Sequence, residues 1–276
     1  MKNTSIRDIL YEPPGPRARR RITLLTVAAL LLIAGLVFLI IRQFADTGQL
    51  DARYWAFFGR ATTWRFLGEG LLSTVEAAVA GALISFAAGF VLMRGRLNKY
   101  PVIRFISAAV IEFTRGVPTL LFIYFFFLVV PQMGWPLSSF WKITLPCAIS
   151  ACGVVAEALR SGVNAVPGGQ REAALSLGFG EIRLFYKILF PQAFRFVIPS
   201  LIAELVIVLK DTTFASVVSY ADLMQNAKVL ISNYDAMLSV YLVVAAIYIL
   251  LNYLLNKLSE YLARRMDRVP AERGAA

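Results

Sequence analysis

Runs of apolar residues long enough to cross a lipid bilayer constrain this chain more than any other feature. Residues 22–41 form a run of twenty amino acids without a charge. An α-helix needs about 20 residues to cover the roughly 30 Å of hydrocarbon in a bilayer. Five more candidate runs follow, at residues 70–93, 102–130, 143–159, 193–215 and 236–256. Because 58% of the residues are hydrophobic, against roughly 45–50% in soluble domains, we expect an all-α integral membrane protein with about six transmembrane helices.

The order of polar and apolar segments predicts four parts. The first apolar run exceeds the roughly 7–15 residues of a signal-peptide core and ends without a small-residue cleavage site, so we interpret it as a retained helix. The parts are a basic, proline-containing leader at residues 1–21, a first helix with an external aromatic linker at 22–67, a membrane domain at 68–262 and a tail at 263–276.

Glycine and proline interrupt two of the apolar runs. Gly116 and Pro118 lie within the third run, and Pro199 lies within the fifth. Proline removes a backbone donor and clashes with the preceding turn, so both runs are predicted to kink.

Lysine and arginine are distributed unevenly between alternate loops. Twenty lie in the leader, the tail and the loops on their side, and six lie in the opposite loops. The positive-inside rule therefore predicts that both termini are cytoplasmic. Basic loops facing anionic headgroups account for most of the net charge of +11, so we expect a lipid bilayer and no nucleic acid as a partner.

A polar, glycine-broken segment separates the fourth and fifth apolar runs. Gly178 and Gly180 interrupt an otherwise amphipathic helix, because glycine costs roughly 1 kcal/mol relative to alanine inside a helix. We therefore expect two short helices around a turn within a cytoplasmic loop at about residues 161–192. Arg171 and Glu172 are left for a partner or for water.

This segment resembles the EAA loop of the permease subunits of ABC importers. The pattern is met by Glu172, Ala173, Ala174, Gly178, Ile188 and Pro191. Phe190 stands where the family usually has leucine. The resemblance implies that Glu172, Ala173, Ala174 and Gly178, with the neighbouring Arg171, couple the permease to an ATPase. An ordinary helical hairpin between two spans is the alternative interpretation.

Four further motifs widen the resemblance to the polar amino-acid branch of the family. They lie at residues 113–118 (FTRGVP), 156–160 (AEALR), 166–170 (VPGGQ) and 209–213 (LKDTT). The branch implies a five-helix permease core, preceded here by one extra helix. The basic leader and the extra helix resemble glutamate permeases of actinobacteria, which favours glutamate as the substrate.

Family resemblance also implies the partners of the chain. These are ABC ATPase subunits, a second permease subunit that is the same or a paralogous chain, and an extracytoplasmic amino-acid-binding protein. The chain has no histidine and no G-x-x-x-x-G-K-[ST] loop, so ATP and Mg²⁺ are expected on the partner ATPase. We expect a non-catalytic inner-membrane subunit with no cofactor and no metal site of its own.

Charged residues inside the apolar runs are the candidates for a substrate pathway, because a charge at the bilayer centre costs roughly 2.5–3.5 kcal/mol. Glu204 and Asp211 are seven residues apart and hence lie on one helix face, and Lys210 is adjacent. Two carboxylates beside an ammonium can hold the charged groups of a zwitterion. Interhelical salt bridges are the alternative role.

Two intrahelical pairs complete the set of buried charges. Glu112 and Arg115 are three residues apart, as are Glu157 and Arg160, so each pair can be satisfied on its own helix face. Arg115 is nevertheless a candidate for the pathway, together with Glu204, Lys210 and Asp211.

Two other classes of function compete with an ATP-driven importer. A secondary amino-acid transporter or channel would explain the intramembrane charges but not the EAA loop. An intramembrane enzyme is disfavoured because histidine and nucleophile motifs are missing from the sequence.

Overall fold

The structure is a computed structural model that describes residues 15–267, with side chains through residue 265. All regular elements among these residues are helical, and five helices are long and apolar enough to cross a membrane, or six if a bent pair is one span. The predicted all-α membrane fold is confirmed. The chain divides into two compact units between Ala56 and Phe57, and each is described by itself.

The first unit is built around one long helix. Helix α2 (Pro16–Asp46) is followed by the 3₁₀ turn Ala52–Tyr54. The helix begins six residues before the predicted apolar run, because Pro16 suits a first helical turn and the arginines that follow are good helix formers. Hydropathy detects only the apolar part of such a helix.

The second unit contains the remaining helices, after a 3₁₀ turn at Ala56–Gly59 on the border. The helices that are long and apolar enough to cross a membrane are α3 (Ala61–Arg96), α7 (Ser139–Ala165), α10 (Phe190–Asp211) and α12 (Met237–Asp267). Helices α4 (Pro101–Gly116) and α5 (Thr119–Tyr124) belong to the bent pair. The shorter helices are α6 (Val130–Gln132), α8 (Gly168–Ser176), α9 (Glu181–Leu184) and α11 (Leu223–Tyr234). Two π-helical turns, Phe125–Val129 and Phe185–Leu189, and a 3₁₀ turn, Thr212–Val217, join neighbouring helices.

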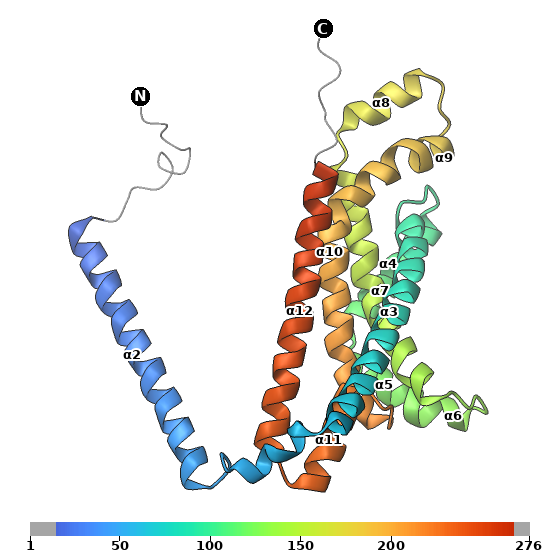
Figure 1. Ribbon diagram of the computed structural model, residues 1–276. Coiled ribbons are helices and arrows are strands. Elements are labelled where there is room, and N and C mark those ends of the chain that lie inside the picture. The colour runs from blue at the N-terminus through green and yellow to red at the C-terminus, as the bar shows by residue number, and fades with distance from the viewer. Residues whose placement is uncertain (1–14, 268–276) are drawn as a thin grey trace. The chain divides into compact units, whose positions relative to one another are not determined.

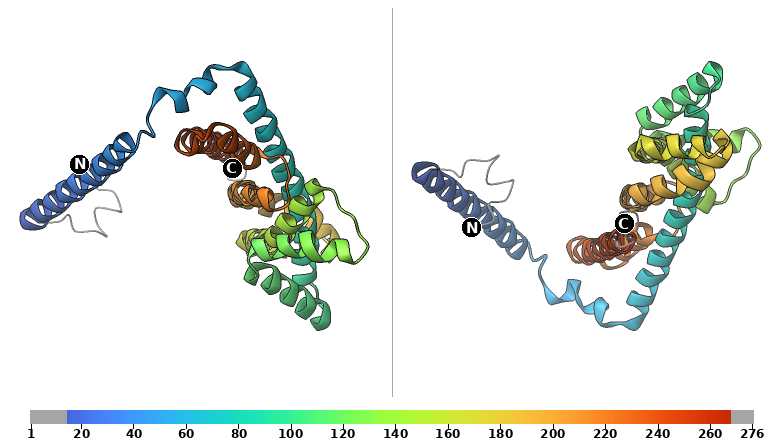
Figure 2. Two further views of the ribbon diagram at one scale, coloured as in Figure 1. Left: turned by 90° about the horizontal axis from the view of Figure 1, so that it is seen from below. Right: turned by 90° about the horizontal axis from the view of Figure 1, so that it is seen from above.

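Helix α7 is the centre of the second unit. It packs against α3, α4, α5 and α10, and α10 in turn packs against α12. Seen along the helices, α12, α10, α7 and α4 follow one another in a row, and α3 runs along one side of this row (Figure 2). Helices α8 and α9 lie at one end of the bundle and α11 lies at the other (Figure 1).

Small residues allow the central helices to approach closely. A Cβ atom on Gly89 of α3 would lie 2.8 Å from Val155 Cγ1 and 2.9 Å from the carbonyl oxygen of Cys152. Only glycine therefore fits this contact, and small residues serve the same purpose in other membrane bundles. Cys147 and Cys152 of α7 are buried and free.

One of the two predicted kinks appears as a break between helices, and the kink at Pro199 stays a prediction. The third run breaks between α4 and α5, which meet at 95° next to Pro118, so this kink is confirmed. In the fifth run, α10 continues through Pro199 without a break. The π-helical turn Phe185–Leu189 lies just before this run and leads into α10.

Candidate functional site

The polar loop between α7 and α10 folds into a helical hairpin. Helix α8 ends at Ser176 and is followed, after the C-cap Leu177, by the left-handed residue Gly178, whose φ is +78°. The amide of Gly178 donates to the Leu175 carbonyl at 2.9 Å, and the amide of Phe179 donates to the Ala174 carbonyl at 3.1 Å. These two bonds form a Schellman motif, which favours glycine at this position. The expected pair of short helices around a turn is confirmed.

Contacts between and beneath the two helices hold the hairpin in shape. Arg171 Nη2 lies 2.9 Å from Glu181 Oε1, which joins α8 to α9. Ala174 and Leu184 are buried. The sequence left Arg171 for a partner or for water, and this was wrong in part, because α9 supplies Glu181. Both side chains of the pair are more than half exposed, so the pair is weak and the guanidinium remains accessible.

The outer surface of the hairpin combines an acidic group with apolar side chains. The carboxylate of Glu172 is exposed and has no hydrogen bond or ion pair within the described part of the chain. Leu175, Leu177 and Ile182 are 44%, 78% and 70% exposed. An apolar patch rimmed by charge is typical of a surface that contacts another protein.

Glu204 is the most deeply buried of the predicted pathway residues. Its side chain is 7% exposed and lines a cavity of about 200 Å³ between α3, α7 and α10. Ser85 also lines this cavity, and most of the other lining residues are apolar. Among the described residues around the cavity, Glu204 is the one ionisable group, so a cationic group entering it would meet a single carboxylate.

Asp211 is the last residue of α10, and its hydrogen bonds link α10 to two other helices. Thr119 Oγ1 donates to Asp211 Oδ2 at 2.9 Å and lies 2.8 Å from Ser150 Oγ. Because a hydroxyl has one proton, Ser150 donates to Thr119. The chain Ser150–Thr119–Asp211 therefore connects α7, the start of α5 and α10.

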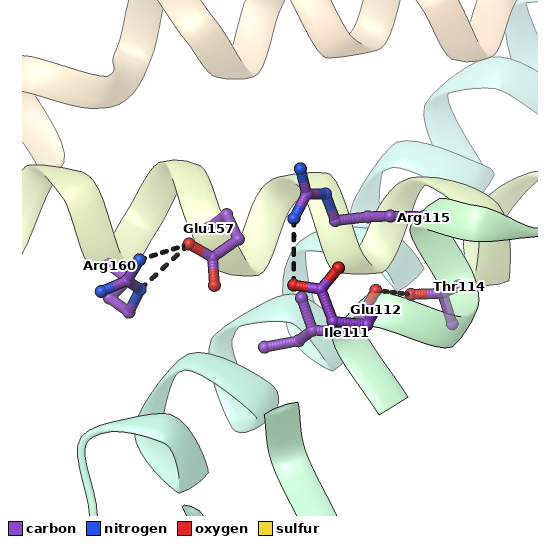
Figure 3. A network of polar contacts seen from close by, with 6 residues as sticks. All are labelled: Ile111, Glu112, Thr114, Arg115, Glu157 and Arg160. Atoms are coloured by element: carbon purple, nitrogen blue, oxygen red, sulfur yellow. Dashed lines mark hydrogen bonds and ion pairs between the residues drawn. The ribbon is translucent and has the colours of Figure 1, made fainter. Parts of the chain in front are cut away.

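The two predicted cations of the pathway lie elsewhere. Lys210 is exposed and has no ion pair among the described residues, and it does not line the Glu204 cavity. Arg115 lies 3.4 Å from Glu112, so the expected pairing on one helix face is confirmed, as is Glu157 with Arg160 at 2.7 Å (Figure 3). The structure thus brings Asp211 together with hydroxyl groups and leaves the ammonium of Lys210 accessible.

A buried polar cluster near the start of α11 was missed by the sequence analysis. Asp222 is fully buried, and its Oδ1 accepts from the amide of Gln225 at 2.8 Å. Its Oδ2 has no partner within the described residues. Thr74 of α3 accepts from the amide of Leu223 at 3.1 Å, which fastens α11 to α3. Burial raises the pKa of Asp222 to about 6.

Few local signals could have pointed to these contacts. Asp222 precedes a helix as an N-cap residue usually does, but an N-cap is ordinarily exposed, and only the packing of α3 buries it. Thr119 directly follows the proline that kinks the third run, whereas nothing in the sequence marks Ser150.

Comparisons with known proteins place the chain in a family. A family model described as "Binding-protein-dependent transport system inner membrane component" matches residues 81–268, and the chain belongs to this family. Within it, the chain is a member of the polar amino-acid permease group that its motifs predicted. It is a multi-pass inner-membrane subunit without catalytic activity of its own, in a family whose permeases bind no cofactor.

Curated relatives span most of the chain. The glutamate transport system permease protein GluD of Corynebacterium glutamicum is 32% identical over 80% of this chain and 83% of its own length. The probable glutamine ABC transporter permease protein GlnM of Bacillus subtilis is 31% identical over 72% of this chain and 93% of its own length. Membership implies an ATPase and a binding protein as partners.

Solved structures share the fold. The crystal structure of an amino acid ABC transporter with histidines has a TM-score of 0.70 and 27% identity, and it covers 76% of this chain and 98% of that chain. An inward-facing structure of the MetNI methionine ABC transporter has a TM-score of 0.63 at 16% identity, over 75% of this chain and 98% of that chain. The second likeness supports the arrangement of helices alone.

Proposed function

We propose that this chain forms the translocation pathway of an ATP-driven importer for polar amino acids, with glutamate as the favoured substrate. It acts with a second permease subunit, two ATPase subunits and an extracytoplasmic binding protein. Both termini and the hairpin of α8 and α9 face the cytoplasm, as the uneven distribution of basic residues indicates.

The exposed side chains of the hairpin support the proposal that an ATPase docks on it. Glu172 is exposed and unpaired among the described residues, and Leu175, Leu177 and Ile182 are exposed beside it. A rigid hairpin seated in a groove of the ATPase would convert nucleotide-dependent closure into movement of α7 and α10.

Reversing one charge on the hairpin tests this coupling. Glu172→Lys turns a favourable contact with a basic groove into a repulsive one. We expect the permease to insert normally and to retain less ATPase during purification. Glu260→Lys on α12 is the control for reversing an exposed charge outside the hairpin, and it also removes the ion pairs of Glu260 with Lys257 and Arg264. Equal ATPase recovery for Glu172→Lys and the wild type would contradict the role of Glu172.

The charges near α10 support a zwitterionic substrate. Glu204 and Asp211 offer carboxylates to an ammonium group, and Lys210 and Arg115 offer cations to carboxylate groups. Glutamate has one ammonium and two carboxylates, so one of the two acids and both cations would match its charged groups. The relative GluD, a glutamate transport permease by its description, supports the same choice.

Reconstitution distinguishes the substrate and the energy source. The permease is assembled with its ATPase and binding protein in proteoliposomes, and uptake of glutamate, glutamine, arginine and cystine is measured with and without ATP. We expect ATP-dependent uptake with glutamate preferred. Uptake that is independent of ATP would favour a secondary transporter, and preference for another amino acid would overturn glutamate.

The composition of the permease pair needs a separate measurement. Two differently tagged copies of this chain are expressed together with the ATPase. Recovery of both tags in one complex indicates a homodimer, whereas a single tag with a second permease chain indicates a paralogous pair.

A further inference from the structure

A large cavity lies between the hairpin and the ends of the membrane helices. Its volume is about 1150 Å³, and its lining comes from residues 94–100, 163–171 and 180–189. These segments are the last turn of α3 with the connection to α4, the end of α7, and the hairpin with its π-helical turn. None of the proposed pathway residues lines it.

Positive charge exceeds negative charge around this cavity. Arg94, Lys99, Arg171 and Arg183 line it, together with one acid, Glu181. Arg171 is paired with Glu181. Within the described residues, the other three cations have no ion pair. Like charges gathered in a concave surface repel one another, and an anion that enters the cavity relieves this repulsion.

Arg94 is held at the cavity wall by aromatic rings. Its guanidinium carbon lies 4.0 Å from the centroid of Phe185 and 5.7 Å from that of Tyr186. Phe185 is itself buried, so the ring is a fixed platform. A ring face stabilises the cation but supplies none of the oxygens that the N–H groups of a guanidinium bind. Those donors remain for an anionic ligand.

The rest of the lining fits an amphipathic ligand, which has one charged part and one apolar part. Leu97, Val163, Val166, Ile182 and Leu189 contribute apolar surface to the same cavity. Helix α8 begins at Gly168 in the wall, and a helix N-terminus favours negative charge. Cations, backbone donors and apolar side chains together suit a phosphate group that is attached to an apolar body.

We propose that this cavity binds the phosphate group of an anionic phospholipid from the adjoining leaflet. Basic pockets between transmembrane helices on the cytoplasmic side are known to hold such headgroups. That this leaflet is the cytoplasmic one rests on the orientation proposed above. The binding of a phosphate group by the cavity does not depend on that orientation. A lipid bound there would contact both α3 and the hairpin, and so would stabilise the position of the hairpin on the bundle.

Lipid affinity of the purified full-length chain tests the proposal. The chain in neutral detergent is titrated with phosphatidylglycerol or phosphatidylcholine, and bound lipid is counted by native mass spectrometry. We expect tighter binding of phosphatidylglycerol. At roughly fivefold per basic side chain near an anionic headgroup, Arg94→Gln with Arg183→Gln should weaken that binding about 25-fold. Neither ATP nor a substrate is present, so failure here leaves the transport function standing.

Matched variants separate the cavity from general surface charge. Arg96→Gln with Lys187→Gln removes two cations from the same two segments, but neither residue lines the cavity, so the wild-type affinity should remain. Glu181→Gln removes the acid and releases Arg171, so phosphatidylglycerol should bind more tightly. Poor folding cannot produce this gain. Equal loss in both double variants, or weaker binding by Glu181→Gln, would overturn the proposal.

Competition distinguishes the sources of the phosphate. If inorganic phosphate does not displace phosphatidylglycerol, the lipid assignment is supported. If it does so with the same dependence on Arg94 and Arg183, the phosphate site is supported and its ligand is a soluble phosphate. Loss of bound phosphatidylglycerol when the ATPase is added would overturn the lipid assignment, since an acidic segment of the ATPase would then fill the cavity. Equal affinity for both lipids would overturn the assignment to an anionic lipid, because phosphatidylcholine has the same phosphate group but no net charge.

Discussion

Ionisable side chains of the membrane domain fall into two groups at the residue scale. Glu157 and Arg160 form a short intrahelical pair that is largely shielded from solvent. Such a pair offsets its own desolvation and needs no substrate to explain it. Glu204, in contrast, is buried beside a cavity without an ion pair among the described residues. We therefore expect a role in the pathway for Glu204, whereas Glu157 and Arg160 need no role beyond their own pairing.

Asp211 allows its charge to be tested apart from its hydrogen bond. Asp211→Asn keeps an oxygen that can accept from Thr119 but removes the negative charge. A charge-assisted contact contributes roughly 1.5–3 kcal/mol, so we expect the substrate concentration for half-maximal uptake to rise about tenfold to hundredfold. Assembly and basal ATP hydrolysis should remain, because the hairpin is unchanged.

The alternative role of Asp211 predicts a different pattern. If Asp211 serves only to hold α5 on α10 through Thr119, then Thr119→Val should impair assembly and Asp211→Asn should leave uptake unchanged. Rescue of uptake by exchanging Lys210 and Asp211, with substrate preference unchanged, would likewise remove both residues from the pathway.

Asp222 makes the stability of the second unit dependent on pH. Burial raises its pKa from 3.8 to about 6 in the folded state. The folded protein therefore holds this proton more tightly than the unfolded chain does, and the stabilisation is fully present below pH 3.8 and is lost as the pH rises through 6. A shift of this size corresponds to roughly 3 kcal/mol.

Asp222→Asn should remove this dependence. The amide oxygen can still accept from Gln225, and no charge forms at neutral pH. The free energy of unfolding of the variant, relative to the wild type, is expected to rise by roughly 3 kcal/mol between pH 3.8 and pH 7.5, as followed by intrinsic fluorescence in detergent. Asp235→Asn, an exposed change at the other end of α11, controls for net charge. A constant difference across this range would contradict the burial of an unpaired carboxyl.

The hairpin of α8 and α9 is the element whose shape depends most on one backbone conformation. Gly178 has a positive φ, and the space around it is open, with no atom within 4 Å of a built Cβ. A side chain at position 178 would meet no neighbour, so the free-energy cost of a substitution comes from the backbone conformation. Left-handed conformation costs L-residues roughly 1–2 kcal/mol, and more for β-branched residues.

Gly178→Val should therefore reorient α9 and reduce ATP-dependent uptake, while insertion into the membrane is unaffected. Asparagine tolerates left-handed conformation better than other residues, so Gly178→Asn is the matched control and should retain most activity. Retained ATPase in the purified complex and uptake by proteoliposomes provide the readouts. Normal transport by the valine variant would show that the turn does not position the docking surface.

At the scale of the whole molecule, the two ends of the bundle in the second unit carry different elements. The hairpin lies at the end where α3 finishes, and α11 lies at the end where α3 begins (Figure 1). A membrane around the bundle therefore separates the hairpin from α11. The proposed orientation places the hairpin in the cytoplasm and α11 outside.

Cysteine labelling checks this orientation. Ser176 of α8 and Ser232 of α11 are both exposed, so either becomes reactive as cysteine wherever the reagent reaches it. In a background lacking Cys147 and Cys152, an impermeant thiol reagent added outside intact cells should label Ser232→Cys and spare Ser176→Cys. Reversed labelling would overturn both the orientation and the docking of an ATPase on the hairpin.

Features of the fold that depend only on residues close together in the chain could be predicted from the sequence. Apolar runs determine which helices enter a membrane, because the hydrocarbon core allows no unsatisfied backbone groups. The kink next to Pro118 and the turn at Gly178 likewise follow from local backbone chemistry. The family motifs at residues 172–191 and 209–213 identified the class of transporter for the same reason, since each motif is continuous in the sequence.

Contacts between distant segments were decided by the packing of the helices. Thr119 and Asp211 are 92 positions apart and meet only because the third run bends by 95° and lies against α7, which also packs on α10. Asp222 is buried because α3 covers the start of α11. Arg94 meets Phe185 because the π-helical turn Phe185–Leu189 lies beside the last turn of α3. Hydropathy and periodicity predict which face of a helix is apolar, but they do not predict which other helix covers that face. That choice depends on side-chain volumes at close approaches such as Gly89 against Val155.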